Sequence, residues 1–331
     1  MLAAGIDALE GVEGGVITGS GMAAISTALL AVFRKGDHLV VQKNLYRGAF
    51  RFITRHLEAF GVSWSETRGT AKADFEAALR AETKAIFIES PTNPRLTVTD
   101  IAMVTALARD HGLLTLFDNT FATPINQQPI AFGVDLVFHS AAKFLGGHGD
   151  LAGGVVVGRE GLIRSTETLA NTLGGSLGPQ VCHLLQRSLQ TLALRIERIN
   201  ENALQIAHFL DQHPSVSEVF YPGLSSHEGH GVAKRQMSGF GGIIAFDLAP
   251  DVEPLSFQRR LQLIHTGNSL GELFTSLNSP ALASTSLGEL TETERAEMGV
   301  TRQLVRLSVG IEDARDLIDD VDRALSQADR S

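Results

Sequence analysis

The chain has 331 residues, of which 44% are hydrophobic and 20% charged, and its formal net charge is −9. The ordinary apolar content argues against a disordered chain and leaves room for one large and one smaller domain, while the negative charge disfavours nucleic acid and anionic membranes as partners. Cys182 is the single cysteine, no apolar run is long enough to span a bilayer and the N-terminus lacks the features of a secretion signal, so we expect a cytoplasmic protein.

The first predicted helix starts after a glycine-rich turn. Residues 1–15 indicate the last turns of an earlier helix that ends at Gly14 and Gly15. Gly19, Ser20, Gly21 and Met22 then open a run of helical periodicity. Glycines before a helix leave free backbone N–H groups at its positive end, which suits a phosphate. The signal is weak by itself, because an ordinary loop-to-helix turn without a ligand has the same pattern.

Strands and helices alternate through the next hundred residues. We predict strands at 38–42, 62–67 and 84–89 and helices at 49–60, 73–80 and 100–111. Tyr46 follows the first strand, where its ring could cover a planar cofactor or simply pack at a domain edge. Pro91 and Pro94 flank Asn93 in a rigid loop after the third strand. Repeated βα units of this kind predict a doubly wound, mostly parallel sheet.

Two further apolar strands each lead into a polar cluster. The strand at 113–117 stops at Asp118, and the strand at 134–138 leads to Lys143. Strands buried on both faces of a parallel sheet read as unbroken apolar runs, and ligands bind beyond their carboxyl ends. We therefore predict that Lys143 holds pyridoxal phosphate as a Schiff base and that Asp118 pairs with its pyridine nitrogen. A turn or N-cap aspartate and a solvated lysine are the alternatives.

The character of the chain changes near residue 214. Before this point we predict a strand at 153–158 and two long helices at 179–192 and 195–213. After it we predict short strands that alternate with helices. The strands are at 216–221, 242–247 and 303–310, and the helices are at 254–263, 292–298 and 313–327. We expect a large α/β domain over 1–213 and a smaller α+β domain over 214–331. Thr291 and Glu294 fit a capping box. Arg306 lies inside an apolar strand and needs a partner, either a substrate carboxylate or an internal ion pair. No histidine or cysteine spacing predicts a metal site.

Six motifs occur in a single order along the chain: SGMAAI (20–25), ESPTNP (89–94), DNTFATP (118–124), HSAAKFLGGHGD (139–150), AKRQMSGFGG (233–242) and VRLSVGIED (305–313). Through them, almost the whole chain resembles the trans-sulfuration family of pyridoxal-phosphate enzymes of cysteine and methionine metabolism. The resemblance implies the fold-type I transferase architecture, an α/β fold with a mostly parallel doubly wound sheet and a smaller C-terminal α+β domain. It also implies a homo-oligomer, a dimer or a tetramer.

The resemblance also implies roles for individual residues. Lys143 and Tyr46 are the implied catalytic residues: the lysine carries the cofactor and moves the α-proton, and Tyr46 stacks on the cofactor and acts on the substrate amine or the leaving group. The implied cofactor contacts are Gly21, Met22 and Ser140 at the phosphate, Asn93 at the 3-hydroxyl, and Tyr46, Asp118 and Lys143 at the ring. Ser269 and Arg306 are the implied contacts of the substrate carboxylate.

The implied reaction breaks or forms a carbon–sulfur bond by β- or γ-elimination or by γ-replacement. Cystathionine or an O-acylhomoserine is the expected small-molecule substrate. O-acylhomoserine sulfhydrylase and methionine γ-lyase activities are alternatives. A further alternative is a non-catalytic or weakly active relative that keeps only the fold and the oligomer.

The sequence departs from the family pattern in four places. Family members carry an N-terminal arm with a Tyr-Ser-Arg motif before the position of Met1, and that arm reaches the neighbouring subunit's phosphate site. Ala142 replaces the usual threonine and removes one hydroxyl from the phosphate site. Arg47 replaces the usual glycine, where it could add positive charge or obstruct the substrate entrance. Asn268 stands where relatives often have Glu or Val, and it leaves the choice of reaction open.

Overall fold

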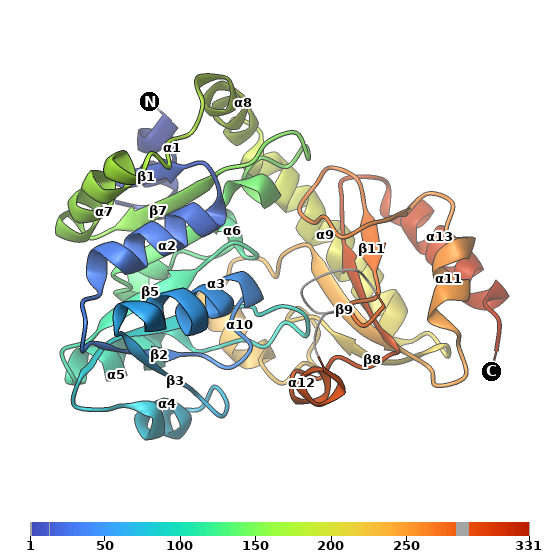
Figure 1. Ribbon diagram of the computed structural model, residues 1–331. Helices are drawn as coiled ribbons and strands as arrows, with labels where there is room; N and C mark the ends of the chain where they lie inside the picture. Colours follow the sequence, from blue (N-terminus) through green and yellow to red (C-terminus); the bar gives the residue numbers. More distant parts are fainter. Residues whose placement is uncertain (1, 13, 283–290, 331) are drawn as a thin grey trace.

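The computed structural model of the chain describes residues 2–12, 14–282 and 291–330. Two β-sheets organise these residues, and helices cover both (Figure 1). Every strand of the first sheet precedes residue 213 and every strand of the second follows it. The fold is therefore an α/β architecture with a mostly parallel central sheet, as predicted. The division into domains at 213/214 stays a prediction.

The first sheet has seven strands in the order β1-β7-β6-β5-β4-β2-β3. Their bounds are β1 Gly15–Thr18, β2 His38–Val41, β3 Ser63–Glu66, β4 Thr83–Glu89, β5 Leu114–Asp118, β6 Leu136–Ser140 and β7 Gly154–Gly158. β7 runs antiparallel to both of its neighbours, β1 and β6, and the other pairs are parallel. The carboxyl ends of β4, β5 and β6 therefore lie side by side at one edge, where a ligand site is expected.

Helices cover both faces of this sheet, so its central strands β2, β4, β5, β6 and β7 are largely buried, whereas the edge strand β3 is polar and partly exposed. The bounds are α1 Leu2–Glu10, α2 Gly21–Val32, α3 Arg47–Phe52, α4 Lys72–Ala78, α5 Ile101–Asp110, α6 Thr123–Asn126, α7 Glu160–Leu173, α8 Pro179–Leu189 and α9 Leu192–Asp211. Apolar residues of α2, α3 and α7 pack on one face of the sheet. Those of α1, α4, α5, α8 and α9 pack on the other.

The second sheet has five strands in the order β10-β11-β12-β9-β8. Their bounds are β8 Val216–Phe220, β9 Ile243–Leu248, β10 His265–Thr266, β11 Ser276–Asn278 and β12 Leu304–Ser308. The described helices in the same part of the chain, after residue 213, are α10 His230–Gln236, α11 Pro254–Arg260, α12 Glu292–Glu297 and α13 Ala314–Gln327. The predicted capping box is confirmed, because Thr291 Oγ1 accepts from the Glu294 backbone and the Glu294 carboxylate accepts from the Thr291 backbone.

Several elements differ from the sequence prediction. The stretch predicted as a helix over 49–60 is helical throughout, but its geometry changes: α3 ends at Phe52 and is followed by a π-helical turn at Ile53–Leu57 and a 3₁₀ turn at Glu58–Phe60. Strands β1, β10 and β11 and helices α6, α7 and α10 were not predicted; all of them except α7 have seven residues or fewer, too few for a clear hydrophobic period. None of the described helices has the length and apolar character needed to cross a membrane.

Candidate active site

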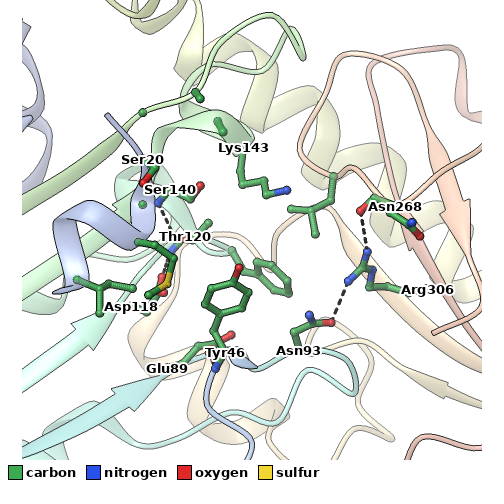
Figure 2. A pocket seen from close by; sticks show the side chains of 18 of the residues that line it. Ser20, Tyr46, Glu89, Asn93, Asp118, Thr120, Ser140, Lys143, Asn268 and Arg306 are labelled. Carbon is green, nitrogen blue, oxygen red and sulfur yellow. Dashed lines mark hydrogen bonds between the residues drawn. The ribbon is translucent and has the colours of Figure 1, made fainter. Parts of the chain in front are cut away.

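A cavity of about 500 Å³ opens at the carboxyl ends of β4, β5 and β6 and extends towards the second sheet (Figure 2). Its walls come from the start of α2, the three strand ends, the segment after β6, and residues on or near β11 and β12. The lining residues are Ser20, Gly21, Met22, Ile25, Tyr46, Glu89, Asn93, Asp118, Thr120, Phe121, Ser140, Ala142, Lys143, Ala152, Gly153, Asn268, Leu270, Asn278, Pro280 and Arg306. The structure thus brings every predicted site residue except Ser269 to one cavity.

Lys143 projects into the middle of this cavity (Figure 2). It lies in the short π-helical segment Ala141–Leu145 that follows β6, and its own backbone is non-helical, with φ −97° and ψ −136°. Burial lowers the pKa of its amine, and the nearby Arg306 guanidinium lowers it further, against the opposing effect of Glu272. No carboxylate of the described residues lies within ion-pair distance of Nζ. The amine is therefore placed to react as a nucleophile or a base.

Asp118 ends β5 at the opposite wall of the cavity and is only 7% exposed. Its Oδ1 accepts a hydrogen bond of 3.0 Å from the Thr120 backbone N–H. Burial raises the pKa of the Asp118 carboxyl, while hydrogen bonds from Thr120 and the nearby His139 lower it. In the described part of the chain, no cationic side chain forms an ion pair with Asp118. A buried carboxylate without a protein cation suits a protonated nitrogen of a ligand.

A buried polar cluster formed by Glu10, Asn119 and His139 connects α1 to the carboxyl ends of β5 and β6. Glu10, the last residue of α1, accepts hydrogen bonds from His139 of β6 at 2.5 Å and from Asn119 Nδ2 at 3.2 Å. His139 is 1% exposed and Glu10 is 2% exposed. The pair joins α1 to the ends of β5 and β6. The sequence analysis missed it, because partners so far apart in the chain leave no local signal.

Tyr46 enters the cavity from the side opposite Lys143 (Figure 2). It precedes α3, and its backbone N–H donates to Glu89 Oε2 at 2.6 Å. A Cβ atom added to Gly48 would lie 2.5 Å from the Tyr46 ring, so glycine at this position allows the ring to fold over the helix. The side chain is 42% exposed because it faces the open cavity. Burial, followed by the Asp118 carboxylate, raises the pKa of the phenol, so it is protonated at neutral pH and can donate a hydrogen bond.

The first turn of α2 meets the end of β6 closely enough to form an anion seat. Ser20 caps the helix by accepting from Ala23 N at 3.0 Å. The backbone N–H groups of Gly21 and Met22 have no acceptor among the described residues. A Cβ on Gly21 would lie 3.0 Å from Ser140 Cβ, a tight contact, so glycine eases this close approach. Free N–H groups at a helix N-terminus suit a phosphate, and Ser140 stands beside them.

Arg306 forms the far wall of the cavity on β12. Its Nη1 donates to Asn93 Oδ1 at 3.0 Å and its Nη2 to the Asn268 carbonyl at 3.4 Å. Within the described residues it forms no ion pair, so the internal ion pair that the sequence left open is not found there. Burial lowers its pKa to about 10, which leaves it cationic at neutral pH. A buried, unpaired guanidinium is suited to a carboxylate ligand.

Two predicted positions point away from the cavity. Ser269 is not among the lining residues, and its hydroxyl donates to Glu272 Oε1 at 2.7 Å, while its neighbours Asn268 and Leu270 line the wall. Arg47 is also outside the cavity: its guanidinium lies 3.9 Å from Glu294 Oε1 on α12 and 5.4 Å from the Phe50 ring centroid. In this conformation Arg47 neither adds charge to the anion seat nor obstructs the cavity.

The residues present fit pyridoxal 5'-phosphate. The anion seat at α2 suits its phosphate, the buried Asp118 its ring nitrogen, the Tyr46 ring one of its faces and the Lys143 amine its aldehyde carbon. The sequence motifs identified Asp118 and Lys143 but missed Thr120 and Glu89, although both belong to quoted motifs. No cluster of potential metal ligands is found among the described residues.

Comparisons with known proteins agree with this geometry. The profile of the family described as "Cys/Met metabolism PLP-dependent enzyme" matches residues 1–326. Cystathionine gamma-lyase of Bacillus subtilis is 43% identical over 96% of this chain and 83% of its own length. Cystathionine beta-lyase of Lactococcus lactis subsp. cremoris is 42% identical over the same shares.

Solved structures agree as well. Cystathionine gamma-lyase from Lactobacillus plantarum, crystallised with L-serine, superposes with a TM-score of 0.94 at 42% identity and covers 99% of this chain and 86% of that one. Cystathionine gamma synthase from Xanthomonas oryzae pv. oryzae, in complex with aminoacrylate and cysteine, gives a TM-score of 0.94 at 38% identity and covers 98% of this chain and 84% of that one.

Proposed function

The chain belongs to the Cys/Met metabolism PLP-dependent enzymes, and from this premise we propose that it breaks or forms the carbon–sulfur bond of cystathionine. The family and the relatives make it a pyridoxal-phosphate-dependent carbon–sulfur lyase or γ-replacement transferase of the trans-sulfuration type. The names of the relatives support cystathionine as the substrate. The observation that carries the proposal is the meeting of Lys143, Asp118 and the unpaired Arg306 in one cavity.

The proposed reaction uses Lys143 in two ways. When bound, the cofactor supplies an electron sink for the charge that develops at the substrate α-carbon. Lys143 Nζ would hold the cofactor covalently, and when free of it the same nitrogen would remove the proton from the substrate α-carbon. The lowered pKa of the amine supports this role, because only its neutral form accepts a proton. Asp118 would keep the ring nitrogen protonated, because no lysine or arginine of the described residues forms an ion pair that would compensate its charge.

Arg306 and Tyr46 orient the substrate in this proposal. The Arg306 guanidinium binds the α-carboxylate by two parallel hydrogen bonds, and Asn93 fixes its plane at 3.0 Å. Tyr46 covers the ring, and its protonated phenol can donate to a leaving sulfur. Its other predicted role, taking a proton from the substrate amine, stays a prediction, as do the cofactor contacts of Gly21, Met22, Asn93 and Ser140 and the carboxylate contact of Ser269.

An assay of the purified protein with pyridoxal 5'-phosphate tests the proposal. The substrates are cystathionine, methionine, and an O-acylhomoserine with cysteine or with sulfide. Cleavage of cystathionine on the γ side gives cysteine, 2-oxobutanoate and ammonia, and cleavage on the β side gives homocysteine, pyruvate and ammonia. We expect cystathionine to be consumed or formed fastest, and a Lys143→Ala control to be inactive.

The other outcomes identify the alternatives. Fastest use of sulfide with an O-acylhomoserine would assign a sulfhydrylase, and fastest use of methionine would assign a methionine γ-lyase. If no substrate is turned over, and if the protein shows no imine absorbance that depends on Lys143, the chain is a non-catalytic relative.

We also propose a cytoplasmic homo-oligomer, a dimer or a tetramer, with domains at 1–213 and 214–331. The negative charge and the lone Cys182 support the location, and light scattering of the purified protein measures the oligomer.

A further inference from the structure

Glu89 is a buried carboxyl group in the cavity to which the proposed reaction gives no role. It ends β4, as Asp118 ends β5, and the two residues are directly paired in the parallel register. Paired residues on neighbouring strands project from the same face, so both carboxyl groups lie at the floor of one cavity (Figure 2). Glu89 is only 5% exposed.

The Glu89 side chain connects two loops that carry predicted cofactor contacts. Its Oε2 accepts from the Tyr46 backbone N–H at 2.6 Å. The nearby backbone N–H of Asn93 lowers the pKa of this carboxyl group. The Gln42 side chain binds the main chain of Glu89: it donates to the Glu89 carbonyl at 3.0 Å and accepts from the Glu89 N–H at 3.3 Å. The end of β4 is thereby a fixed point for the Tyr46 loop and the Asn93 loop.

The surroundings of Glu89 oppose a negative charge on it. The polar groups that face it are the Asp118 carboxyl from β5, the Tyr46 backbone and phenol, and the Asn93 backbone. No lysine, arginine or histidine of the described residues lies within ion-pair distance of it. Burial and the Asp118 charge raise the pKa of Glu89 well above its ordinary range, and they outweigh the lowering effect of the Tyr46 and Asn93 backbone N–H groups. Of two adjacent buried carboxyl groups, one is expected to stay protonated.

We propose that Glu89 is a positioning residue: as a neutral carboxylic acid it ties the Tyr46 and Asn93 loops to β4 and leaves Asp118 as the single negative charge beneath the cofactor ring. The inference rests on the proposed function, in which Asp118 pairs with the protonated nitrogen of the cofactor ring. A second carboxylate beside Asp118 would compete for that nitrogen's proton and would leave a buried charge unpaired. The neutral acid supplies the same acceptor oxygen without the charge.

Two substitutions separate this role from that of a charged residue. Glu89→Gln is neutral and keeps an acceptor oxygen, so we expect cofactor affinity and kcat/KM within about threefold of the unchanged enzyme. Glu89→Ala removes the acceptor of the Tyr46 N–H and releases the Tyr46 loop from β4, so we expect a loss of about tenfold or more in cofactor affinity. Glu76→Gln, on the surface of α4, is the control and should change neither value. Fluorescence titration of the apoprotein with pyridoxal phosphate measures the affinity.

Infrared spectroscopy reads the protonation state directly, without turnover. The unchanged protein should show the C=O stretching band of a buried carboxylic acid near neutral pH; Glu89→Gln should lose it and Glu76→Gln should keep it. The proposal is overturned if that band is absent, if it survives in Glu89→Gln, or if Glu89→Gln loses as much cofactor affinity as Glu89→Ala. The infrared result does not depend on substrate turnover, so failure of the proposed function would appear separately, as inactivity of a protein that still shows the band.

Discussion

Restoring a hydroxyl at position 142 should tighten cofactor binding through the phosphate. Ala142 lines the cavity together with Gly21, Met22 and Ser140. In this seat, free backbone N–H groups and one serine hydroxyl are the donors that the described residues offer an anion. We expect Ala142→Thr to place a further hydroxyl beside the phosphate, as in the family pattern.

The magnitude follows from the charge of the acceptor. A hydrogen bond to a charged group contributes about 1.5–3 kcal/mol net, and fixing the threonine side chain costs on the order of 0.5 kcal/mol. The expected gain is therefore about 1–2.5 kcal/mol, a roughly 5- to 70-fold lower dissociation constant. Fluorescence titration of the apoprotein with pyridoxal 5'-phosphate measures this constant.

Two controls isolate the hydroxyl. Ala142→Val has the shape of threonine without the oxygen, so it should show no gain. Pyridoxal lacks the phosphate, so its affinity should not differ between the threonine and valine variants. The reasoning is refuted if threonine and valine bind the cofactor equally well, or if threonine improves pyridoxal binding as much as binding of the phosphate ester.

Three further predictions concern groups of the same site. Arg306→Lys should raise KM about tenfold or more with a smaller change in kcat, because an ammonium cannot form the two parallel bonds of a guanidinium; steady-state kinetics with the active substrate decides this, and an unchanged KM would remove Arg306 from carboxylate binding. Because burial and Arg306 lower the pKa of Lys143, the rate at which the apoprotein forms an imine should rise with pH and level off below the ordinary lysine pKa of 10.5. Stopped-flow absorbance measures this rate, and Arg306→Met should move the pH profile to higher pH. A shift to lower pH would contradict the electrostatic argument. Glu10→Ala should lower the free energy of unfolding, measured by urea titration, by about 3 kcal/mol, because His139 is left buried without its partner. Glu160→Ala, which removes the partner of Arg164 in a surface ion pair, should change this free energy little. Equal losses in the two variants would show that the buried pair contributes no more to stability than the surface pair.

Much of the site follows from short stretches of sequence. An apolar run that stops at Asp118 and another that leads to Lys143 indicated two neighbouring strand ends, because strands buried on both faces leave polar groups only where they end. Gly21 and Met22 before a helical run indicated free N–H groups in the same way. These signals are local: each depends on residues within one strand, one helix start or one loop, and the motif order then identified the family.

Relations across the sheet were not available from the sequence. The pairing of Glu89 with Asp118 depends on the register of two strands, and the contact of Glu10 with His139 depends on where α1 packs. Side-chain direction was equally hidden: Ser269 turns to Glu272 and Arg47 turns to Glu294, both away from the cavity. The chain by itself determined which chemical groups stand at the strand ends. Tertiary structure alone decided which of them face one another, because register and side-chain rotamers are fixed by packing between segments far apart in the chain.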